Sequence, residues 1–194
     1  MRSRRSSCTL AVATTGLALL AACGGTVNPP AAIPNVLDTV TLYALAGTPI
    51  ATPSAFSILG NTVIRTDLSG VVFDFAFNFD SVGEPVLLPV AAIIGSTPDT
   101  LTLPGLMVTT TPFADITVAP TGGYEVNKPL VVSVGNVVLV RSHFVNPCPD
   151  GSANSLYGKL AVLAIDATAR TIELAVLVDQ NCAYLGLSPG TPTQ

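Results

Sequence analysis

Hydrophobic and polar residues alternate with a period of two over several short segments of this chain, which is typical of half-buried β-strands. The clearest alternation covers residues 71–79. Its odd positions, which face one way, are Val71, Phe73, Phe75, Phe77 and Phe79. Asp74 and Asn78 lie on the opposite face. The pattern predicts a strand whose aromatic face packs into a core and whose other face is polar.

Other apolar or alternating runs, several of them bounded by Pro or Gly, predict the remaining strands. They cover residues 39–45, 62–66, 86–88, 91–94, 106–110, 115–118, 130–134, 137–141, 156–165 and 171–178. Gly135-Asn136 between two of these runs predicts a two-residue hairpin, since both residues tolerate positive φ. In the last pair, residues 160–165 and 175–178 are apolar on both faces, which predicts central strands joined by residues 166–170, with Ile165 opposite Thr171.

These strands predict an all-β fold without a long helix or an internal repeat. We expect eight to ten short strands in a single antiparallel β-sandwich, Ig-like or jelly-roll-like, or in a closed barrel. The predicted sandwich domain covers residues 37–194. Residues 24–36, rich in Pro and Gly and uncharged, predict a tether that reaches at most about 40 Å when extended.

The first 22 residues have a different pattern, with a basic start at Arg2, Arg4 and Arg5 and an apolar stretch too short to span a bilayer as a helix. The run Leu20-Ala21-Ala22-Cys23 that follows resembles the lipobox of bacterial lipoproteins. The resemblance covers residues 1–25 only. It implies that residues 1–22 are a signal peptide and that Cys23 becomes the acylated first residue of the mature chain.

The same resemblance implies a location in the bacterial cell envelope, with the protein held in the membrane by its lipid at Cys23. Gly24 stands where an aspartate would favour the inner membrane, so we expect the outer membrane. A chance cysteine near an ordinary cleavage site is the alternative. Ser3-Arg4-Arg5 partly resembles a twin-arginine export signal, but Ser7 and Cys8 occupy positions where that signal has bulky apolar residues.

Charge excludes one class of partner. The whole chain has a formal net charge of −4, and without the three signal arginines five basic residues face twelve acidic ones, a net charge of −7. Such a surface repels phosphate backbones, so we expect no nucleic acid partner. Direct binding to anionic headgroups is also disfavoured.

Cys148 and Cys182 are the two cysteines left in the exported domain. In an oxidising compartment they most simply form a disulfide, which would close the open end of the last predicted hairpin. A metal site made from these thiols is the disfavoured alternative, because no histidine lies near them in the pattern of a zinc site.

No residue pattern demands a reaction, so we predict no catalytic, cofactor-binding or metal-binding residue. His143 is the sole histidine, no Gly-x-Ser-x-Gly motif occurs, and Asp74 and Asp80 lie too far apart along a strand for a glycosidase pair. Residues 150–154 weakly resemble a calcium loop. The aromatic residues that could bind a sugar are Tyr43, Tyr124, Tyr157 and Tyr184.

The sequence therefore predicts a lipid-anchored envelope protein that acts as a non-catalytic binding or structural module. Its partner would be another envelope protein or a glycan, reached through a sheet edge or loops. Two alternatives remain: an exported hydrolase that uses carboxylates or His143, and a lipoprotein that binds calcium or another small ligand. The hydrolase would need an acid and a hydroxyl beside His143 in a cleft.

Overall fold

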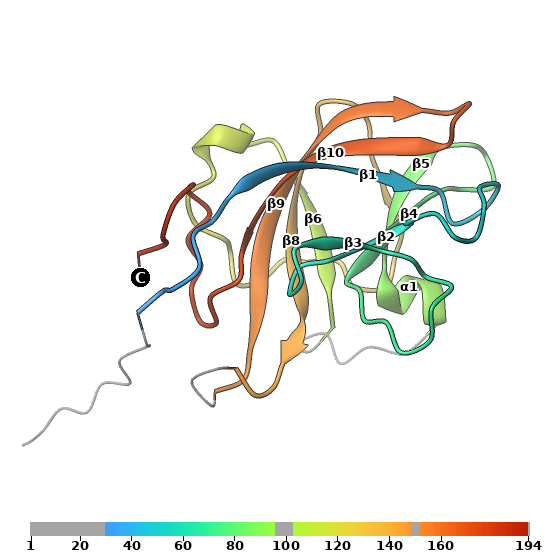
Figure 1. Cartoon of the computed structure of the whole chain (residues 1–194). Helices are drawn as coiled ribbons and strands as arrows, with labels where there is room; N and C mark the ends of the chain where they lie inside the picture. The colour runs from blue at the N-terminus through green and yellow to red at the C-terminus, as the bar shows by residue number, and fades with distance from the viewer. Residues whose placement is uncertain (1–29, 96–102, 149–151, 194) are drawn as a thin grey trace, which may run out of the picture.

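The computed structural model describes residues 30–95, 103–148 and 152–193. It confirms the all-β fold, with two antiparallel sheets of five strands that do not close into a barrel (Figure 1). The elements are β1 (Leu37–Tyr43), β2 (Ala55–Ser57), β3 (Thr62–Ile64), β4 (Phe75–Phe79), β5 (Pro85–Pro89), α1 (Val90–Ile94), β6 (Gly105–Thr109), the 3₁₀ turn η1 (Phe113–Asp115), β7 (Leu130–Val131), β8 (Val137–Val145), β9 (Asn154–Asp166) and β10 (Thr171–Asp179).

The first sheet has the order β1-β10-β9-β8-β6, so the first strand pairs with the last. The second sheet has the order β3-β2-β4-β5-β7. β9 and β10 bend strongly, and their hairpin reaches the end of the molecule opposite the C-terminus (Figure 1). No helix in the described ranges is long and apolar enough to cross a membrane.

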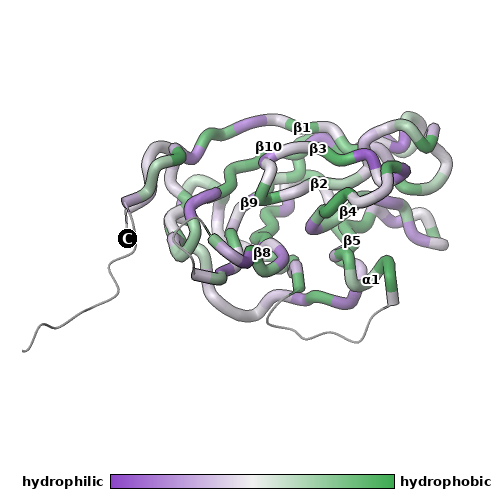
Figure 2. The backbone as a smooth tube through the Cα atoms, turned by 60° about the horizontal axis from the view of Figure 1, so that its bottom comes forward, coloured by the Kyte–Doolittle hydropathy of each residue, from purple (hydrophilic) through white to green (hydrophobic). Residues whose placement is uncertain are grey.

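The core lies between the two sheets and is built from alternate residues of their strands. Phe75 and Phe77 are fully buried and Phe79 is 8% exposed, which confirms the aromatic face of this segment as core. The predicted polar face is wrong, because Asp74 and Ala76 are buried as well. The strand is also shorter than predicted, since residues 71–74 precede it. Figure 2 colours most of neighbouring β5 and α1 as hydrophobic.

The predicted hairpin at Gly135-Asn136 is wrong. Gly135 does adopt a positive φ of 89° in a tight turn. However, β7 before it pairs with β5, whereas β8 after it pairs with β6 and β9. The turn therefore carries the chain from one sheet to the other, which a local turn motif does not distinguish from a hairpin.

Two other predicted strands are also corrected. Residues 91–94 belong to the short helix α1, which begins after Pro89 and ends at Gly95 with a φ of 67°. Residues 115–118 contain the end of η1 and a single bridge from Val118 to Gly186. β2, with three residues, lies outside every predicted strand.

The last hairpin is confirmed with one change of register. Near the turn Ile172, not Thr171, lies opposite Ile165. An irregularity between Glu173 and Leu174 then shifts the pairing by one, so that Val178 faces Gly158 as predicted. Because the shift precedes the open end, the predicted approach of Cys182 to Cys148 holds, and the disulfide between them is confirmed with a Cα–Cα distance of 6.1 Å.

Candidate functional site

Asp74 and His143 form a buried contact between the two sheets. Asp74 lies just before β4 in the second sheet, and His143 lies on β8 in the first. His143 Nδ1 is 2.7 Å from Asp74 Oδ1, which also accepts the His143 backbone N–H at 2.8 Å. The other oxygen, Oδ2, accepts the N–H of Ile58 at 2.6 Å. Three donors, two on His143 and one on Ile58, thus converge on one carboxylate that is fully buried.

The carboxylate changes the proton affinity of the imidazole. Its hydrogen bond and, to a lesser degree, its charge raise the pKa of His143 above the ordinary 6.5, while partial burial of the ring opposes this shift. The His143 side chain is 24% exposed. The ring can therefore exchange protons with solvent while it remains bonded to Asp74.

This pair supplies one half of the arrangement that a hydrolase would need. The acid is present, but within the described chain no hydroxyl is hydrogen-bonded to His143 Nε2. The nearby Ser142 hydroxyl is fully buried; it donates to the His143 carbonyl and accepts the N–H of Leu156. These hydrogen bonds fix the backbone of β8 and β9, so the serine has a structural partner on each side.

A pH dependence of stability follows from the raised pKa. A histidine whose pKa is raised by folding stabilises the native state below its unfolded pKa, about 6.5, and this contribution is lost as pH rises through the folded value. We expect the free energy of unfolding to fall as pH rises from 6 through the range just above 6.5. Denaturant titrations across this range should show less change in His143→Gln than in the parent protein; equal slopes would contradict the linkage.

The outer face of the first sheet, turned away from the common core, carries three buried charged residues. Lys159 on β9 is 2% exposed, Arg141 on β8 is 6% exposed and Asp179 at the end of β10 is fully buried. Tyr157 lies between Asp179 and Arg141 in one row of paired residues. A small apolar cluster under the covering loops is formed by Ile116, Ala119, Leu139, Leu177 and Leu187.

Lys159 holds a covering loop on this face. Its ammonium group donates to the carbonyls of Phe113 and Ile116, both at 2.8 Å, and lies 4.5 Å from the centroid of the Phe113 ring. Burial lowers the pKa of Lys159. In the sequence this residue directly precedes residues 160–165, which are apolar on both faces, and this position is the available indication of its role.

Arg141 orders the aromatic residues beside it. Its guanidinium donates to Leu103 O at 3.0 Å and lies 5.4 Å from the Tyr124 ring centroid. Tyr124 in turn lies 6.1 Å from Tyr157 and donates its hydroxyl to Pro120 O. Burial raises the pKa of both tyrosines. These contacts hold Tyr124 as a structural residue, unlike the exposed sugar platform considered from the sequence.

Residues 32–35, predicted as part of the tether, are bound to the C-terminal segment. Asn181 Oδ1 accepts the N–H groups of Ala32 and Ile33, and Asn181 Nδ2 donates to Ile33 O. Asn35 exchanges backbone hydrogen bonds with Gly190. These contacts attach residues 32–35 to the folded domain, although the sequence placed them in the tether.

Asp179 orients the asparagine that makes these contacts. Its Oδ1 accepts both the backbone N–H and the side-chain N–H of Asn181, at 2.9 and 2.8 Å. Burial raises the pKa of Asp179, and the two hydrogen bonds oppose that shift. The disulfide partner Cys182 follows directly, so one short segment after β10 holds both the start of the domain and Cys148.

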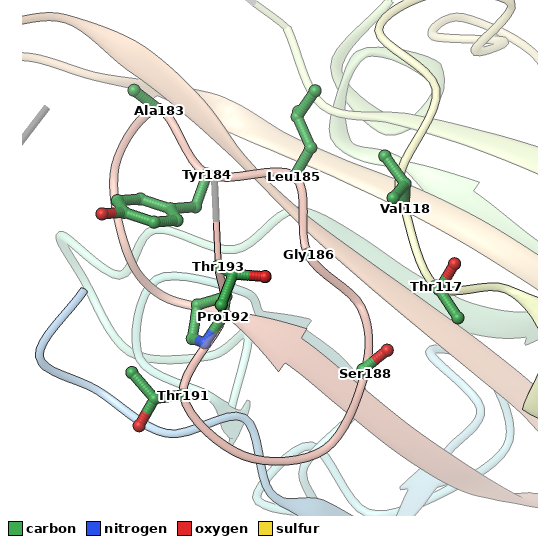
Figure 3. A pocket seen from close by; sticks show the side chains of 10 residues that line it. All are labelled: Thr117, Val118, Ala183, Tyr184, Leu185, Gly186, Ser188, Thr191, Pro192 and Thr193. Carbon is green, nitrogen blue, oxygen red and sulfur yellow. The ribbon is translucent and has the colours of Figure 1, made fainter. Parts of the chain in front are cut away.

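We call the end of the domain formed by residues 30–37, 116–123 and 181–193 the anchor end. It contains the larger described cavity, of about 470 Å³. Figure 3 shows its lining from two loops: Thr117, Val118, Ala183, Tyr184, Leu185, Gly186, Ser188, Thr191, Pro192 and Thr193. A second cavity of about 350 Å³ shares Thr117 and Val118. Asp74 and His143 line neither cavity.

The remaining predicted residues are dispersed. Asp80 caps its own turn by accepting the N–H groups of Val82 and Glu84. No group of three or more metal-ligating side chains occurs among the described residues. Cys23 and residues 150 and 151 of the calcium-like segment 150–154 lie outside the described ranges. Tyr184 is only 5% exposed.

Comparison with known proteins identifies no relative. Scans against protein-family models, curated proteins and solved structures give no match to this chain.

Proposed function

We propose that this protein is a lipid-anchored, non-catalytic binding module of the bacterial cell envelope. The lipobox-like run that ends at Cys23 supports the anchor, and Gly24 after it supports the outer membrane. The contacts of Ala32 and Ile33 with Asn181 attach the chain to the domain from nine residues after Cys23. Nine extended residues reach at most about 30 Å, so the domain would remain close to the bilayer.

The open edge of β1 is the observation that carries the binding role. Tyr43 donates its N–H away from β10, to Pro53 O. Backbone groups alternate sides along an antiparallel strand, so those of Leu37, Thr39 and Thr41 also point off the sheet. Asp38 accepts the Thr39 N–H at 2.7 Å, while within the described chain Thr41 has no hydrogen bond on this side.

An edge strand that no other strand pairs on its outer side, with an outward N–H such as that of Thr41 without a backbone partner in the described chain, is a site for strand addition by another chain. The other edge of the same sheet is protected, because Leu106 on β6 exchanges backbone hydrogen bonds with Glu125. The edges of the second sheet are formed by β3 and β7, with three and two residues. We therefore assign β1 as the docking edge for an extended segment of another envelope protein.

The position of the acid–histidine pair favours binding over hydrolysis. Asp74 uses both carboxylate oxygens to join segments of the two sheets, and His143 lies away from both described cavities. A nucleophile, a base and a substrate pocket are needed together for acyl transfer. The residues that line the larger cavity supply hydroxyls, backbone groups and apolar side chains but no carboxylate, imidazole or amine, so this lining favours binding over proton transfer.

Thr41→Pro tests the docking edge. Proline removes the outward N–H and blocks pairing on that side, but it leaves the β1–β10 hydrogen bonds intact because Thr41 does not donate to β10. We expect a photoreactive residue at position 39, introduced into the full-length protein in intact cells, to give a cross-linked adduct that Thr41→Pro abolishes.

Thr41→Val is the matched control, since it keeps the backbone donor and the strand propensity, and it should retain the adduct. Equal adducts in the two variants would overturn the docking edge. The anchor is tested separately by the mass of the N-terminal peptide, which should begin at an acylated Cys23. An unmodified cysteine at this position would overturn the lipid-anchored role.

A further inference from the structure

We propose that the anchor end lies directly on the surface of the lipid bilayer, so that the membrane holds the domain in one orientation. This inference rests on the proposed lipid attachment at Cys23 and adds a second, non-covalent contact to it. The partner surface is the uncharged interface of a bilayer, at the level between headgroups and acyl chains. Three features of the anchor end support this inference: its segments are joined by hydrogen bonds, they carry no charge, and they expose apolar side chains.

Hydrogen bonds join the three segments of the anchor end into one surface. Asn35 bridges to Gly190, and its side chain donates to the carbonyls of Gly186 and Ser188. Segment 116–123 joins on the other side, where Ala119 donates to Leu185 O and Leu187 donates to Thr117 O. In both whole-chain views the start of the described chain lies beside the C-terminus (Figures 1 and 2). The tether thus leaves from this surface.

No residue in these three segments is charged, although the described chain has acidic and basic residues elsewhere. A charged side chain is costly to place in the apolar part of a bilayer, whereas an uncharged surface avoids this cost. The anchor end also exposes four branched apolar side chains: Ile33 is 43% exposed, Val36 58%, Leu37 54% and Val118 61%. Both features suit an interface with lipid.

The opposite end of the domain, in contrast, carries charged residues. Arg170, in the β9–β10 turn, lies 4.8 Å from the ring centroid of Phe79. The turn after Phe79 carries Asp80 and Glu84, and Asp166 lies at the start of the β9–β10 turn. Val82 in this region is 80% exposed, but it lies between the two acidic residues. At this end an exposed apolar side chain thus lies among charged ones, whereas the three segments of the anchor end are uncharged and have Asp38 and Asp115 at their borders.

Because the proposed lipid anchor already holds the protein at the membrane, a weak contact is sufficient to orient the domain. Attachment through Cys23 keeps the domain within reach of the bilayer, so docking becomes an intramolecular step at high effective concentration. Insertion of a few apolar side chains then fixes the orientation. In that orientation β1 runs from the membrane, at Leu37, toward the charged end, at Tyr43.

The absence of tryptophan from the chain permits a direct measurement. Val36→Trp and Val118→Trp place a single indole at the anchor end, and Val82→Trp is the control at the charged end. The full lipidated proteins are reconstituted in phosphatidylcholine vesicles with brominated acyl chains. We expect the emission of the two anchor-end variants to be quenched and shifted to shorter wavelength, while Val82→Trp keeps the emission of water-exposed indole.

A second pair of substitutions checks the cause of the contact. Adding Val118→Asp to the Val36→Trp protein should reduce its quenching, because a carboxylate then enters the uncharged surface, whereas Val82→Asp should leave that quenching unchanged. If lipidated protein floats with the vesicles but Val36→Trp and Val118→Trp behave like Val82→Trp, the docking inference is overturned and the lipid anchor stands. If Cys23 is unmodified and the protein does not float, the proposed function itself fails.

Discussion

Replacing Asp74 by alanine is expected to lower the free energy of unfolding by about 3–5 kcal/mol, the range for breaking a buried charge pair. The carboxylate is fully buried and accepts hydrogen bonds from Ile58 N, His143 N and His143 Nδ1. Alanine would leave these donors without an acceptor, and each buried donor without a partner costs about 1–3 kcal/mol. The substitution also leaves a small space between the sheets. Denaturant titration at pH 6 measures the loss.

Comparison with His143→Ala separates the carboxylate from its charge partner. The His143 side chain is partly exposed, and its removal leaves Asp74 with the two backbone donors, from Ile58 and His143. We expect a smaller loss than for Asp74→Ala. Thr39→Ala is a surface control that should change stability little. A loss below about 1 kcal/mol in Asp74→Ala, the size of one ordinary hydrogen bond, would contradict a structural role for the carboxylate.

The position of this pair explains why the sequence did not predict it. Asp74 and His143 are 69 residues apart and belong to different sheets, so no spacing relates them. The alternation over residues 71–79 even placed Asp74 on a polar, exposed face. That interpretation assumed a strand covered on one side, whereas the structure buries both faces near Asp74 and Ala76. Whether the face that carries Asp74 is buried depends on tertiary packing, and the local alternation of residues holds no information about that packing.

Predictions that depend on local alternation and on strand pairing near a turn were more successful. The strand β1 lies where period two predicted it, β6 lies at a short run bounded by Pro or Gly, and β9 and β10 lie at the two apolar runs joined by residues 166–170. Short apolar runs were less informative because helix and strand are indistinguishable over four or five residues. In α1, Pro89 before the run and Gly95 after it are the boundary residues that favour a helix.

The covering loops were the part of the fold that the sequence predicted least well. Lys159 and Arg141 occur in strands that were predicted, but the carbonyls they bind come from Phe113, Ile116 and Leu103 in separate loops. Nothing in the local sequence of these loops specifies which sheet face they cover. The charges instead mark where a loop must supply acceptors, because a buried cation without hydrogen-bond partners is strongly destabilising.

Removal of the disulfide is the second large effect. Cys148 and Cys182 are bonded across a sequence separation of 34 residues. A closed loop of this length corresponds to about 4 kcal/mol of lost chain entropy in the unfolded state. We expect Cys148→Ala/Cys182→Ala to lower the free energy of unfolding by about 3–4 kcal/mol on this basis. Chemical denaturation of the oxidised parent and the double variant measures the difference.

The loss should extend locally to the anchor end. Cys182 follows Asn181, whose side chain binds Ala32 and Ile33, so a freer segment after β10 weakens the hold on the start of the domain. Amide exchange at Ala32 and Ile33 should therefore accelerate more than exchange at Leu174 in the middle of β10. Reductant supplies the control: it should destabilise the parent to the level of the double variant and leave the double variant unchanged. A parent protein whose unfolding is insensitive to reductant would contradict a stabilising disulfide.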